Sequence, residues 1–366
     1  DVDVVVDAPG ATASDVATIA GATSGVVTAT VLVGSDTAAD LVAALDPVGG
    51  GAAATDKLDI QLGDASASAA DLSKLATLSA NVINADSVGT ISGTAAELKS
   101  LLDTHQAGGD ISLGAATVDL SVTSDAANTS PSLSDINTLA TELRTESSLA
   151  GKITATVHGT VSAADAKDLT TLGTDAITLQ LSAEVIADAS NLETIAGKTS
   201  EKIDATLATG VKGTGSSVAT ALESTDVTWA STFAPEFAVT VLGTRAGGTA
   251  VSVADLNKIL AAGPGTVTAE VAAISFSGAA GTTLGDIDIK ALDASKLALD
   301  IKVLDSTVSA SAINTLVGKT SVTVDATAAT VVQGSLSDLQ TMVGHLEVAT
   351  PEANMTGTFH IELSDA

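Results

Sequence analysis

The side chains that could do chemistry in this chain are mostly carboxylates. Its 366 residues include 44 Asp and Glu against 15 Lys and Arg, which gives a formal net charge of −29, and they include four His and no Cys. Several aspartates recur at spacings that place them on one strand face or at neighbouring turns: Asp286, Asp288, Asp293, Asp300 and Asp305. Stacked carboxylate oxygens suit hard cations, so this series is a candidate calcium site. The alternative, which we favour, is a solvated acidic face that keeps the protein in solution.

A dedicated calcium site predicts a gain in stability. Repulsion among the excess carboxylates opposes compaction, and a cation that binds only the folded chain adds stability by mass action. We expect the melting temperature to rise in millimolar calcium. An equal rise in magnesium or in simple salt would mean that the effect is screening of the charges.

The aromatic side chains are few, and one group of them stands close together in the sequence. Trp229, Phe233 and Phe237 form this group, whereas Gly109 stands 120 residues before the tryptophan. An aromatic group at such a place is a candidate contact for carbohydrate or another partner. The alternative, which we favour, is that the rings fill a gap beneath a longer loop.

Other chemistry-bearing residue types form no recognisable site. The four histidines are dispersed, and without Cys or a histidine pair at metal spacing a zinc or redox-metal site has no support. Neither a nucleophile elbow nor a P-loop occurs. A polysaccharide-active enzyme would need two acids about 5–10 Å apart in a groove, and no pair is singled out. The sequence therefore predicts no catalysis.

The charge and the hydropathy pattern also limit the partners. The acidic chain repels nucleic acid and anionic membrane surfaces. No run of about 18 consecutive apolar residues occurs, so we expect no membrane insertion. Asp1 follows no initiator Met or signal peptide, so we expect the sequence to begin inside a longer or processed chain. The lack of Cys excludes disulfides, and it suits a secreted bacterial surface protein at least as well as a cytosolic one.

The elements that position these side chains come from an internal repeat. Ser, Thr or Asp is usually followed three residues later by Asp or Glu, and then by apolar residues three apart, which is the pattern of a capping box at a helix start. The pattern opens at Thr12, Thr37, Ser68, Thr94, Ser132, Ser162, Asp188, Thr214, Ser252, Thr283, Ser309 and Ser335. Alternating or β-branched runs between these helices predict strands. Such runs cover residues 26–33, 57–62, 176–181, 203–206 and 322–325.

The repeat has a larger period of about 120 residues. The caps Thr12, Ser132 and Ser252 are 120 residues apart, and matching residue types surround them. Three strand positions are also equivalent, and we expect their side chains to point into the core while the next residue of each strand faces outward. These core positions are Ile83, Ile203 and Val324.

Alternating strands and short helices, returning every 26 to 31 residues for most caps, predict an α/β fold. We favour a repetitive strand-helix solenoid with a parallel sheet and about twelve turns. The turns group into three repeats, residues 1–126, 127–246 and 247–366. The alternative is three compact α/β domains in tandem, divided at the loop-like stretches 123–131 and 242–249.

Two segments of the repeat resemble segments of a known group of proteins. Residues 191–199 and 313–320, each leading to a strand of Val or Ile, Asp, Ala and Thr, resemble the repeats of very large secreted surface proteins of cyanobacteria and other aquatic bacteria. The resemblance implies export by type I secretion and a place in a surface layer or adhesin. The glycine-rich calcium nonapeptide that often ends such proteins is absent here.

We therefore expect an extracellular or cell-surface structural protein without catalysis, part of a filament, surface layer or adhesin. The alternative is a recognition module for cell-surface polysaccharide or a host surface, and a polysaccharide-active enzyme is least favoured. Residues 2–6 and 359–363 occupy equivalent positions in the 120-residue repeat. We accordingly expect end-to-end association with another copy, or continuation in a longer chain.

Overall fold

A computed structural model describes the chain over residues 2–47, 50–106, 109–114, 117–127, 131–146, 149–183, 187–274, 297–347, 352–355 and 358–363. The residues group into two compact units. Unit 1 comprises residues 1–160, 168–179 and 197–201, and unit 2 comprises residues 161–167, 180–196 and 202–366. Each unit is described separately.

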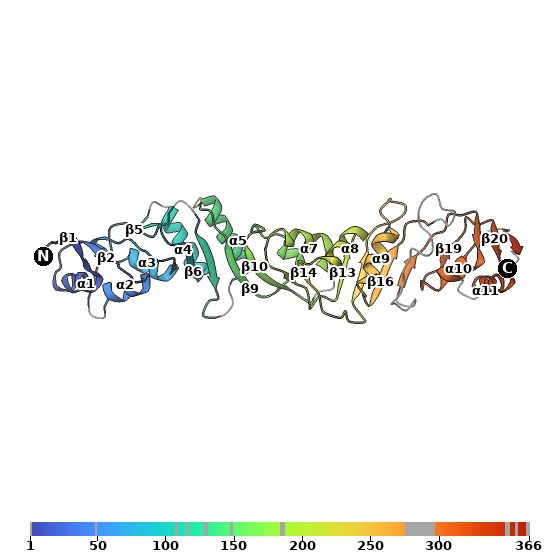
Figure 1. The fold of residues 1–366 in the computed structure, drawn as a ribbon, viewed down its shortest axis with the longest axis horizontal. Coiled ribbons are helices and arrows are strands. Elements are labelled where there is room, and N and C mark those ends of the chain that lie inside the picture. The colour runs from blue at the N-terminus through green and yellow to red at the C-terminus, as the bar shows by residue number, and fades with distance from the viewer. Residues whose placement is uncertain are drawn as a thin grey trace. The chain divides into compact units, whose positions relative to one another are not determined.

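Unit 1 alternates short strands and helices (Figure 1). Its elements are β1 (Val4–Thr12), α1 (Ala13–Ala22), β2 (Val27–Leu32), α2 (Ala38–Leu45), β3 (Lys57–Asp59), β4 (Ser66–Ser68), α3 (Ala69–Ala76), β5 (Ile83–Asn84), β6 (Thr90–Thr94), α4 (Ala95–Gln106), β7 (Ile111–Ser112), β8 (Asp119–Thr123), α5 (Leu133–Thr141), the π-helix η1 (Glu142–Glu146), β9 (Ile153–Val161) and β10 (Ala176–Leu181). The last residue of β9 and the last two residues of β10 belong to unit 2.

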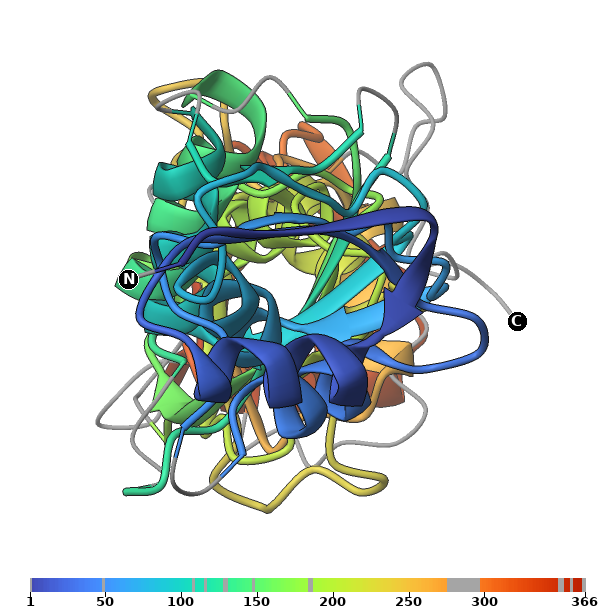
Figure 2. The ribbon, with the colours of Figure 1, turned by 90° about the vertical axis from the view of Figure 1, so that its left-hand side faces the viewer.

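The strands of unit 1 form parallel sheets. Their orders are β1-β2-β3, β5-β7 and β10-β9-β8-β6-β4. In the last sheet Ile91, Leu120 and Ile153 lie in one row, and all three are buried. At the start of the unit, β1 and α1, both dark blue, lie on different sides of the chain (Figure 2).

Unit 2 continues the same alternation (Figure 1). Its elements are α6 (Ala163–Ala166), β11 (Ala187–Asp188), α7 (Ala189–Ala196), β12 (Ile203–Asp204), β13 (Gly210–Gly213), α8 (Gly215–Glu223), β14 (Val227–Thr228), β15 (Ala238–Val241), α9 (Val253–Ala261), β16 (Thr266–Glu270), β17 (Leu297–Asp300), β18 (Thr307–Ser309), α10 (Ala310–Val317), β19 (Val324–Asp325), β20 (Val331–Gly334), α11 (Leu336–Glu347), β21 (Ala353–Asn354) and β22 (His360–Leu363).

The strands of unit 2 also pair in parallel. Their orders are β11-β13-β15-β16-β17, β18-β20-β22 and β19-β21, and β12 pairs with β14 and with Gln180. Val211, Val239, Val267 and Leu297 form one buried row through the first of these sheets. The fold is therefore mixed α/β with parallel sheets, as the sequence predicts.

The predicted helix starts are confirmed wherever the structure describes them. A helix begins directly after each predicted cap except Thr283, which lies outside the described residues. The capping geometry follows the sequence pattern: the Thr37 hydroxyl accepts from the Asp40 amide, and the Asp40 carboxylate accepts from the Thr37 amide. Ser132 and Asp135 form the same reciprocal pair. These bonds satisfy amides that a helix start would otherwise leave free.

The predicted strand register is also confirmed. Ile83, Ile203 and Val324 are fully buried, whereas the residue that follows each of them is partly exposed. Successive side chains of a strand point to opposite faces, so one buried apolar residue determines the outward direction of its neighbour. None of the helices in the described ranges is both long enough and apolar enough to span a membrane.

Candidate functional site

The aspartates predicted to bind calcium divide into three groups in the structure. Asp286, Asp288 and Asp293 lie outside the described residues. Asp300 is held by an arginine, and Asp305 is buried and has a partner within the chain. Within the described ranges, no group of three or more His, Asp or Glu side chains is arranged to hold a metal ion. The calcium site stays a prediction.

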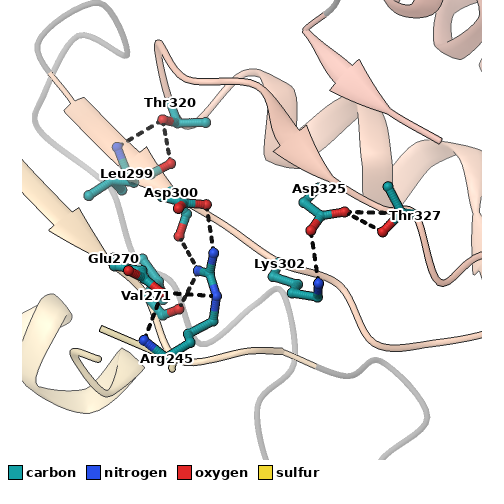
Figure 3. Close-up of polar contacts among 9 residues, drawn as sticks. All are labelled: Arg245, Glu270, Val271, Leu299, Asp300, Lys302, Thr320, Asp325 and Thr327. Carbon is teal, nitrogen blue, oxygen red and sulfur yellow. Dashed lines mark hydrogen bonds and ion pairs between the residues drawn. The ribbon is translucent and has the colours of Figure 1, made fainter. Parts of the chain in front are cut away.

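Arg245 joins three chain segments of unit 2 (Figure 3). Its Nη1 donates to the main-chain oxygens of Val271, at 2.9 Å, and Asp300, at 2.8 Å. Its Nη2 is 2.8 Å from the Asp300 carboxylate, and its Nε is 3.3 Å from Glu270 Oε1. The planar guanidinium therefore satisfies acceptors on β16 and β17 together, a geometry that a lysine ammonium does not reproduce.

A second arginine pairs with a buried carboxylate in unit 1. Arg144 Nη2 donates to Asp175 Oδ1 at 2.6 Å, and the Asp175 side chain is fully buried. The same carboxylate accepts from the amides of Ile153 and Leu172. Asp175 thus connects η1, β9 and the loop before β10. This role has no local sequence signal, because Arg144 and Ile153 lie 31 and 22 residues away from it along the chain.

A buried aspartate equivalent to Asp175 also occurs in the preceding repeat. Asp56 is buried and accepts from the amides of Val27 and Ala53 in unit 1, both at 2.8 Å. Asp56 and Asp175 each stand two residues before a buried strand residue, Leu58 and Ile177 respectively. A buried carboxylate that accepts several amide hydrogen bonds holds separate chain segments together.

Three buried hydroxyl groups form the most regular polar feature. Ser79, Thr199 and Thr320 lie 120 and 121 residues apart, and each is at most 7% exposed. Thr199 Oγ1 accepts from the Ile177 amide and donates to the Ile177 carbonyl, both at 2.9 Å. It also accepts from the Glu201 amide at 3.0 Å. Each of these groups therefore completes the backbone pairing between one strand and the loop that follows the next helix.

The other two hydroxyls make the same contacts. Ser79 exchanges hydrogen bonds with the amide and carbonyl of Leu58. Thr320 does so with Leu299 (Figure 3). The shared position requires a hydroxyl that both donates and accepts, and Ser and Thr fulfil it equally. The 120-residue spacing of these hydroxyls was a signal that the sequence carried and that our prediction missed.

Replacing Thr199 by valine tests this role. Valine keeps the shape but leaves the Ile177 and Glu201 amides without an acceptor, so we expect unfolding free energy to fall by about 1–3 kcal/mol. Thr199→Ser is the matched control, because Ser79 occupies the equivalent place, and its expected loss is about 1 kcal/mol or less. Urea denaturation of both variants provides the measurement. Equal losses would contradict the hydrogen-bonding role.

A second recurring feature is a polar corner after three short strands. Asp204 Oδ1 accepts from the Thr206 amide at 2.9 Å and its hydroxyl at 2.6 Å, while Gln180 donates to Oδ2. Asp325 makes the same contacts with Thr327, and Lys302 takes the place of the glutamine (Figure 3). In unit 1, Asn84 accepts from an amide two residues later. These Asx turns redirect the chain between strands.

The corner carboxylates have lowered pKa values. Burial raises the pKa of Asp204, but hydrogen bonds from Thr206 and Gln180 outweigh burial and bring it below its ordinary value. The pKa of Asp325 is lowered in the same way, by Thr327 and by the ammonium of Lys302. Hydrogen bonds and opposite charge stabilise the ionised form.

A pH dependence follows from the direction of these shifts. A carboxyl whose folded pKa is depressed stabilises the fold above its unfolded pKa, about 3.9, and loses that contribution as pH falls through the folded value. We therefore expect the stability difference between the native chain and Asp204→Asn to be constant at neutral pH and to shrink below about pH 4. Asn84 shows that asparagine fits the corner. Denaturation curves from pH 3 to 7 measure the difference, and an increase toward acid would contradict the assignment.

The aromatic group comes together as one cluster in unit 2. The centroids of Phe233 and Phe237 are 4.1 Å apart, and Trp229 meets both rings edge-on at 6.0 and 5.7 Å. Phe237 is buried, and the Trp229 indole N–H donates to the Ala221 carbonyl in α8 at 3.1 Å. The rings and the indole N–H are thus used within the chain, which favours packing over recognition.

These contacts together join strands, helices and loops within each unit. They fit a repeating mixed α/β protein whose polar residues serve the framework. Comparisons of the chain with protein-family models, with curated proteins and with solved structures find no match.

Proposed function

We propose that the chain is an extracellular structural protein without catalysis, part of a filament, a surface layer or an adhesin. It is built as an α/β solenoid of about twelve turns in three repeats of about 120 residues. Each turn buries its apolar face against its neighbours, and the protein acts through its regular outer surface.

One observation carries this proposal: the residues that recur with the period have framework roles. The hydroxyls of Ser79, Thr199 and Thr320 all pair a strand with a following loop. The corner residues Asp204 and Asp325 both form Asx turns. A repeat whose recurring polar groups are used internally supplies length and regularity, which a structural module needs.

Electron microscopy of the native material tests the structural role. We expect filaments, a sheet or a regular surface array, because a structural module acts through assembly. Dispersed single particles in native material, with no ordered assembly, would contradict the proposal.

Limited proteolysis of the intact chain distinguishes the solenoid from three tandem domains. Elastase cuts beside small apolar residues, which this chain has throughout. Tandem domains would release stable fragments of about 120 residues by cleavage within 123–131 and 242–249, since exposed linkers are nicked first. In a solenoid these cuts expose the apolar ends of turns, so we expect the fragments to be degraded further.

Association through the last described strand is part of the proposal. Ile361 and Leu363 in β22 are 51% and 66% exposed. The equivalents of Ile361, Leu120 and Val239, are buried beside β9 and β16. A further parallel strand, from continuing chain or from another copy, would cover them. We expect light scattering of the purified chain to show concentration-dependent association, and a monomer at high concentration would count against it.

A further inference from the structure

The repeat places equivalent strand pairs in unit 1 and unit 2. Leu58 and Leu299 correspond, because the amide of each donates to one of the three recurring buried hydroxyls, Ser79 for Leu58 and Thr320 for Leu299. The next residues, Asp59 and Asp300, therefore correspond as well. Asp59 pairs with Thr30 on the neighbouring strand, and Asp300 pairs with Glu270.

In unit 2 the guanidinium of Arg245 lies beside the paired residues Glu270 and Asp300. Its guanidinium contacts the Asp300 carboxylate and carbonyl, the Val271 carbonyl and the Glu270 carboxylate (Figure 3). The arginine is carried by the long segment between Val239 and the helix cap Ser252, 13 residues later. This loop holds the guanidinium against the outward side of β16 and β17.

In unit 1 the equivalent residues line an open hollow. Thr30, Val31 and Asp59 correspond to Glu270, Val271 and Asp300, and all three line a cavity of about 490 Å³. Asp59 is exposed, and its carboxylate has no hydrogen-bond or ion-pair partner among the described residues.

The preceding segment of unit 1 is too short and too uncharged to fill this hollow. The cap Thr12 comes only eight residues after Val4, and the bulged part of β1 contains no Lys or Arg. Gly10 crosses β2 closely, with a positive φ of 107°, and a Cβ there would lie 2.5 Å from the Thr30 oxygen. The backbone passes beside the hollow and supplies no cation to it.

We infer that this hollow of unit 1 binds the guanidinium group of an arginine side chain that another molecule supplies. The chain has two arginines, and both are held in ion pairs, Arg144 with Asp175 and Arg245 with Asp300. The net charge of −29 attracts a basic partner segment. This binding does not depend on whether the chain assembles into a filament.

The lining explains why arginine suits the hollow. In unit 2 one guanidinium donates to two carbonyls and to a carboxylate, and the planar fork fits such spread acceptors better than an ammonium does. Leu32, 45% exposed, lines the same hollow and offers apolar surface to the methylene stem of an arginine. Thr30 supplies no charge where Glu270 does, so the site in unit 1 is the weaker of the two.

An NMR titration at fixed ionic strength tests the inference, with N-acetyl-arginine amide as the probe and N-acetyl-lysine amide as the matched cation. We expect saturable shifts at Thr30, Val31, Gly34 and Asp59 with the arginine probe, and a dissociation constant on the order of millimolar because the pair is exposed. Equal binding of the lysine probe, or shifts spread over the whole acidic surface, would overturn the inference.

Two substitutions in the hollow provide the controls. Asp59→Asn removes the charge at nearly constant shape, and we expect it to weaken binding by up to about fivefold. Thr30→Glu copies Glu270, and we expect it to tighten binding by a similar factor. Unchanged affinity in Asp59→Asn would overturn the assignment.

Removal of Arg245 from unit 2 provides a positive control for binding of the arginine probe. Arg245→Ala empties the occupied position, so we expect this variant to bind a second equivalent of the arginine probe and to melt at a higher temperature in its presence.

A peptide distinguishes an arginine side chain from a free guanidinium ion as the ligand. We expect methylguanidinium to bind more weakly than the peptide Ac-Gly-Arg-Gly-NH2, since it lacks the methylene groups that would pack on Leu32. Equal binding of the two would overturn the assignment to an arginine side chain.

Discussion

Replacing Asp175 by alanine is expected to lower the free energy of unfolding by about 3–5 kcal/mol, the usual cost of removing one partner of a buried ion pair. The substitution removes the acceptor of the Ile153 and Leu172 amides and leaves the Arg144 guanidinium with the Gly151 carbonyl alone, at 3.3 Å. Arg144 is 19% exposed, so water compensates part of the loss and the lower half of the range is expected. Guanidinium chloride or urea denaturation measures the change.

Three variants separate the charge from the hydrogen bonds. Asp175→Asn keeps an acceptor oxygen but removes the charge, so its loss should be smaller than that of alanine. Asp56→Ala removes an equivalent carboxylate that binds two amides. In the double variant Asp175→Ala/Arg144→Ala, the loss of unfolding free energy should be smaller than the sum of the losses in the two single variants, because the two side chains share one interaction. A loss below about 1 kcal/mol in Asp175→Ala would contradict the structural role.

Replacing Ile203 by alanine is expected to cost about 2–4 kcal/mol, because it empties a fully buried position in the short strand β12. Loss of the side chain removes both its transfer free energy and the packing of its neighbours. Chemical denaturation should show a lower midpoint with an unchanged slope, which indicates a change in stability alone.

The matched controls are apolar residues at different depths. Ile83→Ala empties the equivalent position in unit 1 and should cost a similar amount. Val82 is 51% exposed, so Val82→Ala should change stability by no more than about 0.5 kcal/mol. If Ile203→Ala were as mild as Val82→Ala, the strand register would be wrong.

The local chemistry of the chain determined the element order and the core positions. Caps such as Thr37 and Ser132 bind amides three residues away, so the sequence window itself contains both partners. The burial of Ile203 beside the partly exposed Asp204 follows from strand alternation, which is also local. These predictions are confirmed because the forces behind them act within a few residues.

The polar framework was decided only by tertiary structure. Asp175 reaches Arg144 across 31 residues, and Arg245 reaches Asp300 across 55 residues. Nothing in the neighbourhood of Asp300 distinguishes a cation ligand from an arginine partner, because that choice depends on where a distant loop lies. Side-chain partners that are remote in sequence become specific only when the register of neighbouring strands brings their atoms within hydrogen-bonding distance.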